Sequence, residues 1–150
     1  MDNIKQLKMD LVNMVNNHSK VEKPKLKPLI YISHPSSGLQ SNADETAEIV
    51  RQLYKNDDIY NNFCIVSPIH CYGFMYDDTD YYKGLSFCTD LMMHCSLVLL
   101  CGNWKNSVGC KEEKRLCDIY GIPYMEIKDL ETLKQMEKDG ICKRMLSKVK

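Results

Sequence analysis

Four short apolar runs alternate with helix-like segments between residues 29 and 127 of this 150-residue chain. The runs have the length of buried strands: Leu29–Ser33, Phe63–Val66, Leu97–Cys101 and Tyr124–Ile127. Between them, apolar residues recur at helical spacing, most clearly over 42–54 and 84–94. Regular alternation of strand and helix forms a parallel sheet with helices on both faces. We therefore predict an α/β domain with a flavodoxin- or Rossmann-like three-layer fold and a mostly parallel sheet of about four to five strands.

Both ends of the chain extend beyond this alternation. Residues 1–28 carry apolar side chains at helical spacing and then the stretch KVEKPKLKP, so we predict an amphipathic N-terminal helix followed by a linker. This helix either docks on a partner or forms a partly ordered arm, and it lacks the bulky aromatics of a membrane anchor. Residues 29–150 are assigned to the α/β domain, and the pattern after residue 129 predicts one or two terminal helices broken at Gly140.

Charge and hydropathy exclude several classes of protein. The 20 basic residues balance the 20 acidic residues, and no basic stripe is interleaved with aromatics, so we expect no nucleic-acid partner. No apolar stretch approaches the roughly 20 residues of a membrane span, and the polar N-terminus lacks a signal-peptide core. We expect a cytoplasmic protein with no membrane partner, no metal and no cofactor.

The eight cysteines do not have the spacing of a metal or disulfide motif, because no C-x-x-C occurs. Cys88 and Cys95, like Cys110 and Cys117, are seven residues apart on helix faces that otherwise carry Leu, Ile and Met. A free cysteine packs like a small hydrophobic residue. We therefore interpret the cysteines as core residues rather than as metal ligands or redox centres.

The segment 95–127 carries the most specific signal for a binding site. Its strand ends at Gly102, the following loop holds the only tryptophan, Trp104, and a helix opens at Ser107 and Gly109. A helix start presents free backbone N–H groups that suit an anionic ligand. Ligands of parallel sheets bind beyond the carboxyl ends of the strands, where the loops after the first three strands meet. We expect Trp104 to form a pocket wall there rather than to lie in the core.

Aromatic side chains are concentrated in the predicted long loop from Pro68 to Tyr82. They either stack a nucleobase at the rim of the pocket or form a subunit interface. These aromatic residues are Tyr72, Phe74, Tyr76, Tyr81 and Tyr82.

Four stretches resemble the nucleoside 2-deoxyribosyltransferase-like family, which includes deoxynucleoside monophosphate N-glycosidases and many phage and bacterial proteins. They are YISHPSSG, SPIHCYGF, GLSFCTDLMMHC and VLLCGNWKNSVGCKEE with GIP. The resemblance covers roughly residues 29–127. Its most specific element is S-x-G-x-x-x-E, which matches Ser107, Gly109 and Glu113.

The resemblance implies that Glu113 is a catalytic nucleophile. In this family a glutamate attacks the anomeric carbon of a nucleoside, displaces the base and forms a glycosyl-enzyme intermediate. A carboxylate suits this step because cleavage develops oxocarbenium character. We place Glu112 and Glu113 in the first turn of their helix and expect Glu113 to stay ionised there. The alternative is an ordinary glutamate favoured by the helix dipole.

The resemblance also implies a set of substrate-binding residues. Ser107 and Gly109 match positions that contact the 5′ group in phosphate-accepting members, and Ser107 also suits a helix N-cap. The loop after the first strand resembles the loop that lines the sugar and base pocket, with His34 where glycine or alanine is common; a surface or hydrogen-bonding role is the alternative for His34. The predicted substrate-binding residues are Tyr31, Ser33, His34, Ser36, Ser37, Gly38, His70, Trp104, Ser107 and Gly109.

A second carboxylate is expected in the helix before the third strand, where family enzymes carry an aspartate that positions the sugar or protonates the leaving base. Asp90 is the acid available in this helix, and we assign it this catalytic role. The position that matches the family aspartate is Cys88. Asp90, two residues later, points about 200° away from Cys88 around the helix. The acids of the preceding loop, Asp77, Asp78 and Asp80, are the alternatives.

Two functions from different classes follow. The first is an enzyme, a hydrolase or transferase, that cleaves or exchanges the N-glycosidic bond of a nucleoside or nucleotide. The second is a non-catalytic nucleotide-binding module, such as a sensor or sponge for a nucleotide-derived signal. Because relatives are usually oligomers, the resemblance implies a homodimer or higher homo-oligomer.

Overall fold

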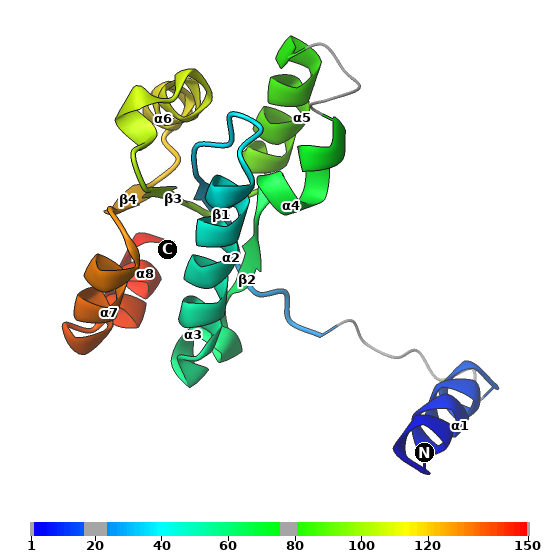
Figure 1. Cartoon of the computed structure of the whole chain (residues 1–150). Coiled ribbons are helices and arrows are strands. Elements are labelled where there is room, and N and C mark those ends of the chain that lie inside the picture. Colours follow the sequence, from blue (N-terminus) through cyan, green and yellow to red (C-terminus); the bar gives the residue numbers. More distant parts are fainter. Residues whose placement is uncertain (1, 17–23, 76–80, 150) are drawn as a thin grey trace.

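A parallel sheet of four strands forms the centre of the computed structural model, which describes residues 2–16, 24–75 and 81–149 (Figure 1). The strands are β1 (Leu29–Ser33), β2 (Cys64–Val66), β3 (Leu97–Cys101) and β4 (Tyr124–Ile127). Their order is β2-β1-β3-β4, and every neighbouring pair is parallel. The predicted fold is confirmed, and each strand begins within one residue of its predicted start.

Helices cover both faces of the sheet, because alternate residues of each strand point to opposite sides. Ile30 and Ile32 of β1 face one layer of helices, whereas Tyr31 faces the other. The first layer consists of α2 (Gln40–Tyr54), α3 (Asp57–Asn62), α7 (Leu130–Lys138) and α8 (Ile141–Lys148). The second consists of α4 (Pro68–Tyr72), α5 (Tyr81–Met93) and α6 (Val108–Tyr120) (Figure 1). The arrangement is a three-layer, Rossmann-like fold.

The strand order places a crevice between β1 and β3. From β1 the chain passes to β2 on one side, and β3 then pairs on the other side of β1. The connections that leave the carboxyl ends of β1 and β3 therefore lead to α2 and α6, which lie on opposite faces. Such a switch point is where open parallel sheets bind ligands.

Two segments differ from the prediction. The loop expected from Pro68 onward is helical as far as Met75, through α4 and the 3₁₀ turn η1 (Gly73–Met75), so the loop assignment was wrong there. Pro68 occupies the first helical position, where its fixed φ favours a helix start. The short helix α3 was not predicted; the side chain of Asn56 caps it by accepting hydrogen bonds from two backbone N–H groups. Tyr76 and the loop acids at 77, 78 and 80 lie outside the described residues.

The chain ends follow the predicted pattern. The N-terminal helix is α1 (Asp2–Asn16), and residues 3–16 are all exposed. The terminal helices α7 and α8 are separated at Gly140, whose φ of 83° lies in the left-handed region that glycine tolerates. Within the described ranges, no helix has the length and apolar character needed to cross a membrane.

All eight cysteines lie in the described ranges, none of them forms a disulfide, and six of them are buried in the layers between helices and sheet. Cys64 and Cys71 are the exposed exceptions. Among the described residues, no group of three or more His, Cys, Asp or Glu side chains is arranged to hold a metal ion.

Candidate functional site

A pocket of about 420 Å³ opens at the carboxyl edge of the sheet, between the loop after β1 and the start of α6. This volume lies in the range of small-molecule sites. The structure brings seven of the predicted site residues together around it, namely His34, Ser36, Ser37, Gly38, Ser107, Gly109 and Glu113. Two further predicted residues, Tyr31 and Ser33, are fully buried on β1 beside Glu113.

Glu113 is the buried acid of this pocket. It is only 7% exposed, and its Oε2 makes no hydrogen bond of good geometry to any described residue. Its neighbour Glu112 has a different environment, because it is half-buried and forms a two-point ion pair with Arg115 at 2.9 and 2.5 Å. The helix therefore points one glutamate into the pocket and the other toward solvent.

The position of Glu113 in α6 differs from the prediction. The helix begins at Val108, no acidic residue lies in its first turn, and Glu113 falls in the second turn. Placement in the first turn was therefore wrong. Because the effect of the helix dipole is concentrated in the first turn, it contributes less to the charge of Glu113 than expected.

Burial raises the pKa of Glu113 from 4.5 to about 7, and the hydroxyl groups of Tyr31 and Ser33 act in the opposite direction. The expectation that Glu113 stays ionised was therefore wrong, because loss of hydration outweighs the neighbouring donors. Near neutral pH the protonated and ionised forms are both populated. The Oγ of Ser33 also lacks a hydrogen bond of good geometry to a described residue, although the hydroxyl is close enough to lower this pKa.

The start of α6 offers hydrogen-bond donors to the same pocket. Ser107 is the N-cap, and its Oγ accepts a hydrogen bond from the backbone N–H of Cys110 at 3.3 Å. The N–H groups of Val108 and Gly109 have no backbone acceptor among the described residues. Both residues line the pocket. Capping and anion binding can therefore coexist at this helix start.

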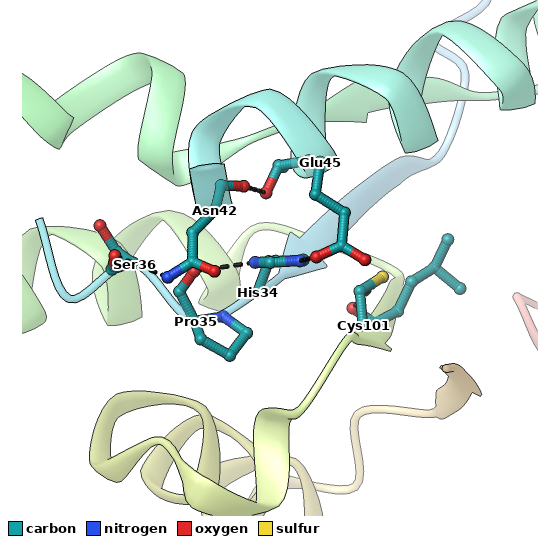
Figure 2. A network of polar contacts seen from close by, with 8 residues as sticks. His34, Pro35, Ser36, Asn42, Glu45 and Cys101 are labelled. Atoms are coloured by element: carbon teal, nitrogen blue, oxygen red, sulfur yellow. Dashed lines mark hydrogen bonds and ion pairs between the residues drawn. The ribbon is translucent and has the colours of Figure 1, made fainter. Parts of the chain in front are cut away.

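A tight turn holds the opposite wall. Ser37 and Gly38 have φ values of 46° and 66°, and the N–H of Leu39 donates to the carbonyl of Ser36 at 2.9 Å. A left-handed serine is strained, so the surrounding contacts must hold it. The side-chain amide of Asn42 on α2 supplies one such contact by donating to the same carbonyl at 2.9 Å (Figure 2).

His34 joins this loop to α2 and to the loop after β3. Its Nε2 lies 2.9 Å from Oε2 of Glu45, and its Nδ1 lies 2.8 Å from the carbonyl oxygen of Pro35 (Figure 2). Both ring nitrogens therefore lie within hydrogen-bond distance of an oxygen atom. The side chain is 1% exposed, and a Cβ at residue 102 would come within 2.9 Å of Nε2. Gly102, at φ 61°, leaves room for the ring.

Three predicted site residues lie away from this pocket. Trp104 is 9% exposed and belongs to the core beneath α5 and α6, although it also lines a separate hollow of about 480 Å³ at the ends of β3 and β4. His70 is exposed and bonds through Nδ1 to Oγ of Ser67 at 2.7 Å. Asp90 is exposed on α5, whereas Cys88, two residues earlier, is buried. The structure therefore does not bring Asp90 together with Glu113.

The pocket also contains Cys110, which the sequence placed only in the core, and Tyr81, which it placed either at the rim of the pocket or at a subunit interface. Cys110 lies one helical turn before Glu113 and lines the pocket, and burial raises the pKa of its thiol. Its interpretation as a core residue is confirmed, because it is 1% exposed and belongs to the core beneath α6. Its position three residues before Glu113 was the signal that it also reaches the pocket. Tyr81, from the predicted aromatic rim, also lines the pocket, and burial followed by the nearby Cys110 and Glu113 raises the pKa of its phenol.

Comparison with protein-family models, with curated proteins and with solved structures finds no match for this chain. The family resemblance therefore stays a prediction, and the functional argument depends on the geometry of the pocket.

Proposed function

We propose that this chain binds a nucleoside 5′-phosphate in the pocket between β1 and α6 and cleaves or exchanges its N-glycosidic bond, with Glu113 as the nucleophile. One observation carries the proposal: the buried carboxyl group of Glu113, with the hydroxyls of Tyr31 and Ser33 beside it, shares a pocket with the N–H groups at the start of α6. The carboxylate suits the sugar carbon, and the helix start suits the phosphate.

In the proposed reaction the ionised Oε2 of Glu113 forms a bond to the anomeric carbon as the bond to the base nitrogen breaks. The electron pair goes to the base, which takes up a proton. A water molecule or a second base then releases the sugar from Glu113. Because attack needs the ionised form and burial raises the pKa to about 7, the rate of base release is expected to rise with pH through neutrality.

The proton for the leaving base has no second carboxylate as its source among the described lining residues of the pocket. Besides Glu113, the titratable side chains that line the pocket among the described residues are those of His34, Tyr81 and Cys110. Asp90 is exposed on α5, so we assign it no step.

The same observation supports a second candidate, a nucleotide-binding module without catalysis. Buried Cys88 occupies the position at which a partner aspartate is expected, and Glu113 is only partly ionised at neutral pH. In that case the carboxyl group of Glu113 would accept or donate a hydrogen bond to a ligand hydroxyl.

Incubation with nucleosides and nucleoside 5′-monophosphates of each common base, in ribose and deoxyribose forms, tests both candidates. Mass spectrometry of the supernatant reports free base, and native mass spectrometry reports retained ligand. An enzyme releases base, and Glu113→Gln abolishes release while retaining binding; the matched change in the solvent-facing neighbour, Glu112→Gln, has no effect. A binding module retains intact ligand with no release. If no member of the set is bound or cleaved, both candidates are wrong.

A further inference from the structure

A second cavity of about 260 Å³ adjoins the pocket that contains Glu113. Four residues line both spaces, namely His34, Ser37, Asn106 and Ser107. The two cavities therefore meet at the gap between the turn after β1 and the start of α6. The far wall of the second cavity includes Asn42, Glu45 and Asn103, none of which lines the first.

The shared boundary coincides with the start of α6. Ser107 caps this helix, and the N–H groups of Val108 and Gly109 have no backbone acceptor among the described residues. Val108 and Gly109 line the first cavity and Ser107 lines both, so a phosphate on these N–H groups would lie in the first cavity beside the boundary. A group attached to the far side of the phosphate would enter the second cavity.

The lining of the second cavity indicates the chemistry of that group. Side-chain amides of Asn103 and Asn106, the hydroxyl of Ser37 and the carboxylate of Glu45 contribute to it, whereas no lysine or arginine does. Amides, hydroxyls and a carboxylate form hydrogen bonds with sugar hydroxyls. A further terminal phosphate would face Glu45 without a lysine or arginine partner, so a neutral, hydroxyl-rich group fits better.

The wall between the cavities is fixed. His34 is bonded at both ring nitrogens, to Glu45 and to the carbonyl of Pro35, and the backbone at Gly102 lies against the ring. The residues that line both cavities besides His34 belong to the turn and to the approach to α6, so a ligand that spans the cavities would cross there.

From the shared boundary and the lining of the second cavity, we propose that the ligand is a nucleoside 5′-diphosphate sugar, in which a diphosphate joins a sugar to a nucleoside. The nucleoside occupies the pocket with Glu113, both phosphates lie along the start of α6, and the sugar lies beside Asn103 and Glu45. The placement of the nucleoside follows from the proposed function.

Affinities for two probes with the same base test this assignment: a nucleoside 5′-monophosphate and a nucleoside 5′-diphosphoribose, measured by isothermal titration calorimetry across the common bases. We expect the diphosphoribose to bind at least about tenfold more tightly, which is about 1.4 kcal/mol. Asn103→Phe fills the second cavity and is expected to remove most of this preference. The matched control is Asn61→Phe, which makes the same change at an exposed asparagine on α3 and is expected to keep the preference.

The outcomes separate the two proposals. If both probes bind with equal affinity, or if Asn103→Phe weakens both to the same extent, the second cavity has no role and the inference fails while the nucleotide site stands. If neither probe binds for any base, the proposed function fails as well. Circular dichroism confirms that each variant is folded before its affinities are compared.

Discussion

The Nε2 atom of His34 occupies the space beside Gly102 that a side chain there would need. A Cβ atom added at Gly102 would lie only 2.9 Å from this nitrogen. The buried histidine and the glycine thus determine how closely the loops after β1 and β3 approach. Because these loops form two walls of the pocket, this contact determines its shape.

Gly102→Ala is expected to destabilise the fold for two reasons, the left-handed φ of 61° and the clash with His34. Gly121→Ala is the matched control, since Gly121 has a φ of 68° but nothing within 4 Å of an added Cβ. We expect a loss of about 1–2 kcal/mol at Gly121 and a larger loss at Gly102. Urea unfolding measures both, and equal losses would show that the contact with His34 is unimportant.

Removal of the partner of His34 is also expected to destabilise the protein. Glu45→Ala leaves Nε2 of a nearly fully buried ring without its acceptor, so we expect a loss of about 1.5–3 kcal/mol. Glu48→Ala on the same helix removes only an exposed pair with Arg51, which contributes at most about 1 kcal/mol. A loss no greater for Glu45→Ala than for Glu48→Ala would contradict a structural role for the pair.

The stability of the protein is expected to depend on pH through Glu113. Burial raises its pKa in the folded state from 4.5 to about 7, so folding favours the protonated form. The stabilisation from protonated Glu113 is fully present below about pH 4.5 and is lost as pH rises to about 7. The free energy of unfolding is expected to fall by on the order of 3 kcal/mol across that range. Glu113→Gln removes the dependence, whereas Glu112→Gln at the solvent-facing neighbour retains it. Denaturant unfolding at intervals from pH 5 to pH 8 measures the difference, and parallel pH profiles for wild type and Glu113→Gln would refute it.

Ser107 allows stability and anion binding to be separated. Ser107→Ala loses the cap and is expected to lower stability by about 1 kcal/mol. Ser107→Asp keeps a capping oxygen but adds a negative charge, so stability is retained while affinity for a nucleoside 5′-monophosphate falls. Thermal unfolding and titration calorimetry on both variants provide the comparison. Unchanged affinity in Ser107→Asp would place the phosphate elsewhere.

The strands could be predicted because each is a short apolar run, and Leu97–Cys101 is buried along its whole length. α3 could not be predicted from periodicity, since six residues are too few to show an amphipathic pattern. The sequence feature that indicates α3 is the capping residue Asn56, which is followed by two aspartates in the first turn of the helix.

The candidate site could be predicted where it depends on local order along the chain, as at Ser107, Gly109 and Glu113. The start of α6 at Val108 agrees with the predicted opening at Ser107 and Gly109. The raised pKa of Glu113 comes from its burial against β1, which no local pattern indicates. The contact between His34 and Glu45 joins residues eleven apart through tertiary packing, so no sequence pattern indicates it.

The central claim, that Glu113 attacks the sugar of a bound nucleotide, is tested most directly by peptide mapping after an acid quench. Wild-type protein is mixed with the nucleotide from which it releases base, quenched during turnover, digested and analysed by tandem mass spectrometry. We predict a glycosyl ester on Glu113, absent from the Glu113→Gln variant, which also releases no base. Base release that continues undiminished in Glu113→Gln, with no sugar on Glu113 in the wild type, would contradict the claim.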